Sequence, residues 1–181
     1  SLPWALMGLF IGFTYSGVLV FISIELNSMG AGIRGSAFFA IFALMIIISR
    51  PLVGKVYARY GSKFIIYPGL GLFILGLFGL GLATTPMAII LTAPLLGLGY
   101  GAAQPAFQAL AIQSAPIERA GVSTATYFLA LDISVGAGSI ILALLANALG
   151  YQYLYIIAAL VMVIALSLYH VWIKKYTPLE I

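Results

Sequence analysis

The sequence has no cysteine, one histidine and four acidic residues, and only 7% of its 181 residues are charged. Without cysteine, disulfide bonds, thiolate nucleophiles and cysteine-ligated zinc are excluded. With so few histidines and carboxylates, we expect neither a metal centre nor a cofactor. A soluble domain carries about 25% charged residues, whereas 64% of this chain is hydrophobic. The composition therefore indicates an integral membrane protein, and the length suits a single domain.

Six long apolar stretches divide the chain. A helix needs about 20 mostly apolar residues to cross a bilayer, whereas strands of a membrane barrel would alternate in polarity over about ten residues. Because the stretches are continuously apolar, the sequence predicts an all-α integral membrane fold. The six transmembrane helices are expected at Pro3–Ile24, Ser36–Val56, Phe64–Ala83, Met87–Ile112, Gly121–Ala146 and Tyr153–Ile173.

A faint internal repeat relates the two halves of the chain. "RGSAFFAIFA" from Arg34 begins the second stretch, and "RAGVSTATYFLA" from Arg119 begins the fifth. The two stretches would enter the membrane from opposite faces, as in inverted repeats. We therefore expect two inverted three-helix repeats, at about residues 1–83 and 84–181.

The basic residues lie mainly on one side of the expected bundle. The net charge of +4 predicts no nucleic-acid partner, because these residues flank apolar stretches and form no solvated face. Positively charged connections stay in the cytoplasm, so both termini are expected there, in a multi-pass plasma-membrane protein surrounded by lipid. Only Arg34 falls on the other side, against Lys55, Arg59, Lys63, Arg119, Lys174 and Lys175.

The basic segment also carries a family signature. "GKVYARYGSK", residues 54–63, resembles the loop motif G-x-(L/V)-x-D-R-x-G-R-(R/K) of the major facilitator superfamily, with Ala58 replacing the acid and Ser62 a base. The motif is usually weaker in the C-terminal half of the family, and "SRPLVG" before it is similar to that half in bacterial drug-efflux-type members. The stretches 94–111 and 118–155 resemble the fourth helix, and the fifth helix with the final hairpin, of such a half. The matching residues are Gly54, Val56, Arg59, Gly61 and Lys63.

This resemblance implies a fold of twelve helices in two halves, of which the chain supplies one. Because it begins at Ser1 and not at a methionine, we expect a piece of a longer protein or a processed chain. Its partner would be a missing N-terminal half or a second copy in a homodimer. The resemblance implies a secondary active transporter that works by alternating access. We expect proton-coupled efflux of small, lipophilic molecules and no enzymatic activity.

The signature segment suggests a local structure of its own. Residues 57–63 are expected to form the loop between the second and third helices, with Gly54 and Gly61 bracketing a turn, because glycine tolerates a positive φ or a close approach. Arg59 and Lys63 could then reach anionic lipid headgroups or helix C-termini. Ala58 lacks the charge of the family's acid, so we expect this loop to serve topology more than gating.

Asp132 is the foremost candidate for the chemistry. It lies 11–12 residues into the fifth stretch, about 17 Å along a helix and near mid-membrane. Acids at this depth usually face a cavity or a partner, so Asp132 is a candidate proton carrier. The alternative is a structural ion pair, for example with Arg50 from the other half or a second copy. Arg50 is expected nearer the cytoplasmic edge than Asp132, so a pair within this chain is not expected.

Several polar side chains could line a substrate path with Asp132. Gln104 and Gln108 are four residues apart and share one face of a helix. The alternative for these residues is hydrogen bonding between helices. The other candidates are Tyr100 on the same helix, Thr14 and Tyr15 in the first stretch, and Thr124 and Tyr127 in the fifth.

Two other functions compete with transport. A rhomboid-type intramembrane protease needs a G-x-S-G motif, but "GAGS" at residues 136–139 has a different spacing, and His170 lies at the membrane edge. A six-helix bundle with only a structural or dimerising role is the other alternative. Glu25 and Arg34 are expected at the outer rim, as a gate or as solvated loop charges.

Overall fold

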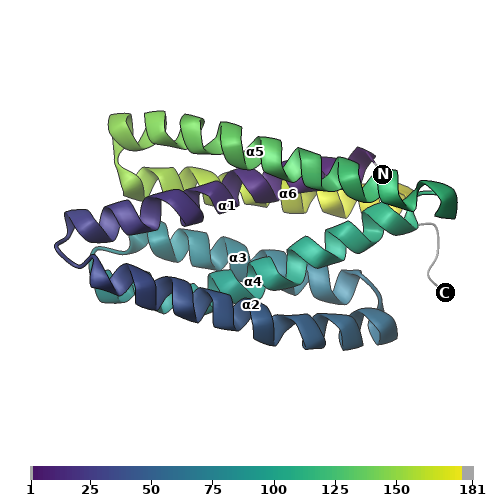
Figure 1. Ribbon diagram of the computed structural model, residues 1–181, viewed down its shortest axis with the longest axis horizontal. Helices are drawn as coiled ribbons and strands as arrows, with labels where there is room; N and C mark the ends of the chain where they lie inside the picture. The colour runs from purple at the N-terminus through teal and green to yellow at the C-terminus, as the bar shows by residue number, and fades with distance from the viewer. Residues whose placement is uncertain (1, 177–181) are drawn as a thin grey trace.

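A computed structural model describes the backbone of residues 2–176 and the side chains of residues 2–173. The described chain forms six long helices, and a short 3-10 turn at Ile117–Arg119 precedes the fifth (Figure 1). Each helix is long and apolar enough to cross a membrane, which confirms the predicted fold class. The helices are α1 (Leu2–Ser28), α2 (Ile33–Tyr60), α3 (Lys63–Leu82), α4 (Pro86–Gln113), α5 (Ala120–Leu149) and α6 (Tyr151–Tyr176).

The expected loop at residues 57–63 is wrong, because α2 continues to Tyr60 and only two residues separate it from α3. The basic residues mark where the chain leaves the apolar core, but they do not end the helix. Gly61 ends it: its φ is 82° and its ψ is 178°, a conformation essentially restricted to glycine, and its N–H donates to Tyr57 O. Gly54 lies inside α2 and so brackets no turn, and a Cβ added to it would meet no atom within 4 Å outside its own helix backbone.

The α3–α4 connection follows the local sequence closely. Thr85 is the N-cap of α4, and its side chain accepts a hydrogen bond of 3.3 Å from the N–H of Ala88. Pro86 occupies the first turn, where its missing N–H leaves no intrahelical bond unmade. Thr85 and Pro86 together therefore define the start of α4.

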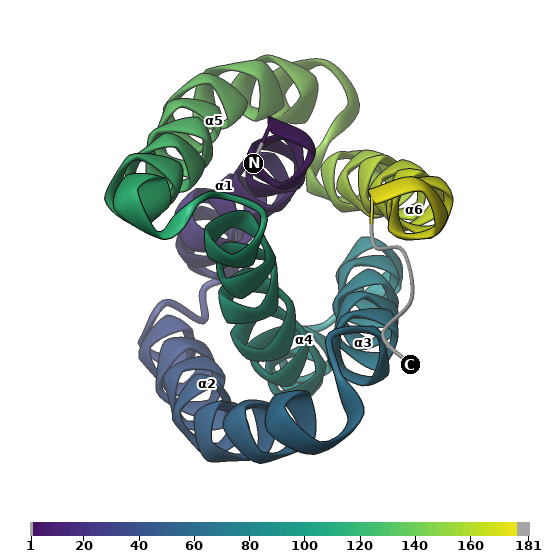
Figure 2. The same ribbon diagram turned by 90° about the vertical axis from the view of Figure 1, so that its right-hand side faces the viewer.

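The six helices form a bundle in which α1 and α4 lie near the centre (Figure 2). The first helix of each triplet packs against the second helix of the other, α1 against α5 and α4 against α2, while α3 packs against α4 and α6. This exchange is the contact pattern expected for two inverted three-helix units. The boundary between the units near residues 83 and 84 stays a prediction.

Close helix crossings depend on small residues. A Cβ on Gly99 of α4 would lie 2.5 Å from the backbone N of Phe73 and 2.8 Å from Gly69 O, both on α3. A Cβ on Gly12 of α1 would lie 2.5 Å from Leu131 O on α5. Such close approach of backbones is typical of helices that pack in lipid.

The two ends of the bundle differ in charge. We call the basic end the one that holds the start of α1, the α2–α3 turn and the α4–α5 connection (Figure 1). It carries Lys55, Arg59, Lys63 and Arg119, whereas the opposite end carries Arg34. The predicted contributions of Lys174 and Lys175 lie outside the described side chains.

Candidate functional site

Two tyrosines from the central helices form the middle of the candidate site. The rings of Tyr15 on α1 and Tyr100 on α4 stack with centroids 4.3 Å apart and an interplanar angle of 18°. Phe42 on α2 lies 6.2 Å from each of these rings. Both tyrosines are half-buried, so the group combines an apolar aromatic surface with two hydroxyls.

Two opposite charges lie at nearly the same depth as these rings. Arg50 is ten residues before the end of α2, and Asp132 is twelve residues after the start of α5. At 1.5 Å per residue these positions are about 15 and 18 Å from the basic end. Tyr15 and Tyr100 are both thirteen residues, or about 20 Å, from the same end. The four side chains therefore belong to one layer of the bundle.

Tyr100 lies at the centre of this layer. Its ring stacks on Tyr15, and it is near enough to Asp132 and Arg50 for both charges to influence its hydroxyl. The expectation that Arg50 lies near its helix end is wrong, because α2 extends beyond the apolar stretch to Tyr60. In the described residues α2 and α5 do not contact each other. The helices that hold the two charges thus lie on either side of α1 and α4, and both charged side chains are exposed.

Gln104 and Gln108 continue the polar face of α4 toward the basic end, and both are half-buried. Tyr127 is fully buried, and its hydroxyl donates a 3.0 Å hydrogen bond to the backbone carbonyl of Gln104. Thr124, half-buried one turn earlier on α5, donates to Ala120 O at 2.9 Å. The bond of Tyr127 joins α5 to α4, so this side chain contributes to helix packing.

Thr14 lies on a different side of α1 from Tyr15. It is fully buried, and its hydroxyl donates to the carbonyls of Phe10 and Ile11, each at 3.0 Å. The same hydroxyl is 3.9 Å from Met162 Sδ on α6. The structure therefore places Thr14 among the helices and does not bring it to the tyrosine layer.

Glu25 differs from the solvated rim charge expected from the sequence. It lies in the last turns of α1, only 3% exposed, and interacts with Tyr155 of α6. The sequence placed it in a connection because the apolar stretch ends at Ile24, yet α1 continues to Ser28. Arg34 lies at the same end of the bundle as Glu25, opposite the basic end, but its side chain is exposed.

The residues of the protease alternative are far apart in depth. His170 is exposed, and its Nδ1 is 2.8 Å from Tyr67 Oη of α3. It is six residues from the end of α6, whereas Ser139 is nineteen residues into α5. Measured from the basic end, these positions are about 9 and 29 Å deep, and Ser139 donates to Gly136 O. Among the described residues no group of three histidines or carboxylates could hold a metal ion.

Comparison with known proteins identifies the family. The family model of the Major Facilitator Superfamily matches residues 1–139. The chain belongs to the major facilitator superfamily, and it is a multi-pass membrane protein. A relative from Escherichia coli O6:H1, the uncharacterized MFS-type transporter YhhS, is 30% identical over 152 residues, which are 83% of this chain and 37% of that protein. YhhS of Escherichia coli K12 is 29% identical over 150 residues.

Solved structures agree on the fold. A peptide transporter POT in complex with alafosfalin superposes with a TM-score of 0.83 at 16% identity, covering 97% of this chain and 38% of that one. A POT family transporter in complex with 5-aminolevulinic acid has a TM-score of 0.83 at 15% identity and 38% coverage of its chain. This chain thus spans under two fifths of the length of these relatives and has the fold of part of them.

Proposed function

We propose that this chain forms one half of a secondary transporter that moves small molecules by alternating access. The observation that carries the proposal is the single layer in which Arg50, Tyr100 and Asp132, on three different helices, lie at nearly the same depth. Charged side chains at mid-membrane depth are costly and usually mark an ion or substrate path. A bundle with only a structural role has no need of two such charges beside an aromatic pair.

A second six-helix unit would cover the face that carries this layer. The helices α2 and α5, which hold Arg50 and Asp132, are the least buried of the six. Because the chain covers 37% of the YhhS relative, we favour an N-terminal half as the partner, with a second copy as the alternative. Rocking of the two units about the layer would open it to each side of the membrane in turn.

Asp132 is the proposed proton carrier of the cycle. Its carboxylate is exposed on the half and would become enclosed when the second unit closes over it. Acids in the membrane interior are typical of the proton relays of transporters, which is the role we propose for this carboxylate. Arg50 in the same layer is its proposed counter-charge.

The layer favours a small, lipophilic substrate. The stacked rings of Tyr15 and Tyr100 offer an apolar surface, and the amides of Gln104 and Gln108 could orient one polar group. The peptide-transporter neighbours are 15–16% identical and indicate the fold alone. The positive-inside rule favours the basic end in the cytoplasm of a plasma-membrane protein. The proposed direction is efflux, because "SRPLVG" at residues 49–54 resembles bacterial drug-efflux-type members.

Proteoliposomes test this proposal with ethidium as the lipophilic probe. The full chain, with its second unit, is reconstituted, and an imposed pH gradient drives ethidium movement. Asp132→Asn is expected to abolish the gradient-dependent part of the flux. Glu118→Gln, which removes an exposed acid in the α4–α5 connection, is the matched control and should retain it. Equal gradient-driven flux in wild type and Asp132→Asn would remove Asp132 from the mechanism.

A further inference from the structure

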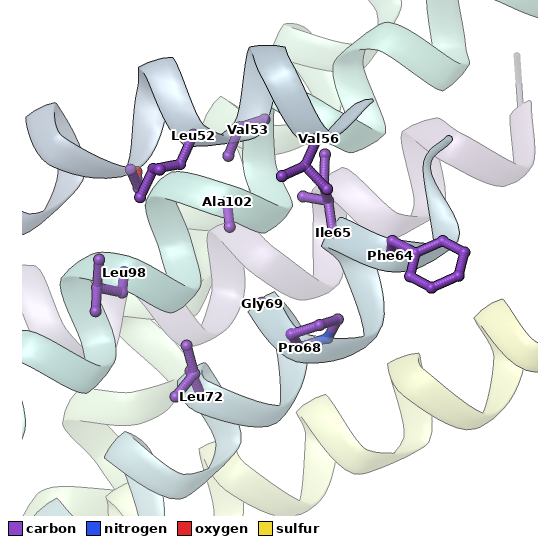
Figure 3. Close-up of a pocket in the computed structure, with 11 residues that line it drawn as sticks. Leu52, Val53, Val56, Phe64, Ile65, Pro68, Gly69, Leu72, Leu98 and Ala102 are labelled. Atoms are coloured by element: carbon purple, nitrogen blue, oxygen red, sulfur yellow. The ribbon is translucent and has the colours of Figure 1, made fainter. Parts of the chain in front are cut away.

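An apolar groove lies between α2, α3 and α4 near the basic end (Figure 3). Its volume is about 270 Å³, and its walls include Val53 and Val56 of α2, Ile65 and Leu72 of α3, and Leu98 and Ala102 of α4. Ser49 of α2 is the one polar side chain among its lining residues, and the Ser49 hydroxyl donates to its own helix at Ile46 O, 2.7 Å away. The groove therefore presents an almost wholly apolar lining.

The groove opens on a different side of α4 from the candidate transport site. Residues advance about 100° per position around a helix. Leu98 and Ala102, which line the groove, therefore lie on nearly the opposite side of α4 from Tyr100 and Gln104. An occupant of the groove would leave the tyrosine layer free, so the groove needs an explanation separate from the transported substrate.

Three cations surround the end of the groove that faces the basic end. Lys55 and Arg59 occupy the same stripe of α2 as Leu52 and Val56, because these positions are three or four residues apart. Lys63 directly precedes Phe64, another lining residue. All three cations are exposed, and no acidic residue occurs between positions 26 and 117. The guanidinium of Arg59 lies 5.4 Å from the ring centroid of Tyr60, an aromatic residue typical of the membrane interface.

We propose that this groove and its three cations bind one anionic phospholipid. The headgroup phosphate contacts Lys55, Arg59 and Lys63, and an acyl chain lies in the groove between α2 and α3. From Val56 to Ser49 the groove runs seven residues along α2, or about 10 Å into the membrane. The charge selects an anionic headgroup, and the apolar depth distinguishes a lipid from free phosphate. The bound lipid holds the α2–α3 turn to α4 at the basic end.

Site-specific quenching tests the proposal on the full chain in phosphatidylcholine nanodiscs. The chain has no cysteine, so Leu52→Cys places a bimane fluorophore in the groove wall. Leu75→Cys on α3 is the matched control, because Leu75 is 60% exposed, Leu52 is 55% exposed, and only Leu52 lines the groove. Acyl-brominated phosphatidylglycerol and phosphatidylcholine are then added at equal mole fractions, since bromine quenches bimane on contact.

Brominated phosphatidylglycerol is expected to quench the label at position 52 at a much lower mole fraction than brominated phosphatidylcholine. At position 75 the two brominated lipids are expected to quench the label equally. Each cation removed by Lys55→Gln, Arg59→Gln or Lys63→Gln should weaken the preference about fivefold, and all three together about a hundredfold. Arg119→Gln, at the same end but away from the groove, should leave the preference unchanged.

Three results would overturn the proposal. Equal quenching by the two lipids at position 52 would show that the groove does not select charge. An unchanged preference in the triple variant would remove the three cations from the site. Loss of the preference in excess soluble glycerol phosphate would show that the cations bind a free phosphate rather than a lipid.

Discussion

The crossing of α1 and α5 beside Asp132 provides the sharpest test of the packing. A Cβ added at Gly12 would overlap the hydroxyl of Ser134 and lie 2.5 Å from Leu131 O. Ordinary van der Waals contact begins near 3.4 Å, so α1 and α5 must separate by about 0.9 Å at this point. The Ser134 hydroxyl is bonded to Leu131 O at 2.8 Å, so rotating it away breaks that hydrogen bond. Gly12→Ala should therefore move Asp132 relative to Tyr100.

The expected loss of stability follows from overpacking. Adding a methyl group to a closely packed site costs about 1–3 kcal/mol. For a chain of this size, 1 kcal/mol corresponds to about 2–4 °C in Tm, so Gly12→Ala should melt about 5 °C lower. Gly71→Ala is the matched control: it lies inside α3, and a Cβ there would meet no atom within 4 Å outside its own helix backbone. Alanine is the better helix former, so the control should melt at the wild-type temperature or slightly above it.

Thermal unfolding of the two variants in detergent measures this difference. Gradient-driven ethidium flux in proteoliposomes then shows whether the shift of α5 reaches the site, and we expect Gly12→Ala to lower the flux while Gly71→Ala retains it. A Gly12→Ala variant as stable and as active as Gly71→Ala would refute the close α1–α5 crossing and the placement of Asp132 that depends on it.

Two further substitutions test local contacts by the same unfolding assay. Gly61→Ala should destabilise the chain by about 1–3 kcal/mol, because its φ of 82° with a ψ of 178° suits only glycine. The control Gly54→Ala, inside α2 with no neighbouring side chain, should be neutral or stabilising. Equal effects of the two substitutions would contradict the end of α2 at Gly61. Tyr127→Phe should cost about 1 kcal/mol of stability, because it loses the hydrogen bond to Gln104 O. Tyr153→Phe, at an exposed position, should cost less. Equal losses of stability in the two variants would show that this hydrogen bond does not stabilise the packing of α5 on α4.

The fold could be predicted from the sequence because each helix is continuously apolar over the length of a bilayer. Helix ends were less predictable, because hydropathy marks where a residue leaves lipid and not where its backbone hydrogen bonds stop. The last turn of α2 and the last turns of α1 illustrate this. Both continue past the apolar stretch, to Tyr60 and to Ser28, and this error misplaced Arg50 and Glu25.

The candidate site was predictable only in part. An acid at mid-membrane depth is conspicuous, so Asp132 was found from composition and position alone. Arg50, Tyr15 and Tyr100 share the layer of Asp132 because of the way in which α1, α2, α4 and α5 cross. Those crossings cannot be predicted from a single sequence. The same limit explains Thr14: its neighbour Tyr15 faces the aromatic layer, while Thr14, one position and about 100° away, packs toward α6.

Labelling of single cysteines tests the central claim most directly, because it needs no known substrate. Gln104→Cys lies on the proposed path, whereas Leu98→Cys is on the opposite side of α4, in the lipid groove. A membrane-impermeant thiol reagent is applied to the full chain with its second unit, in vesicles, from outside or from inside in separate experiments. Alternating access predicts that position 104 reacts from both sides and position 98 from neither. Reaction of position 104 from one side only, or from neither, would contradict the account.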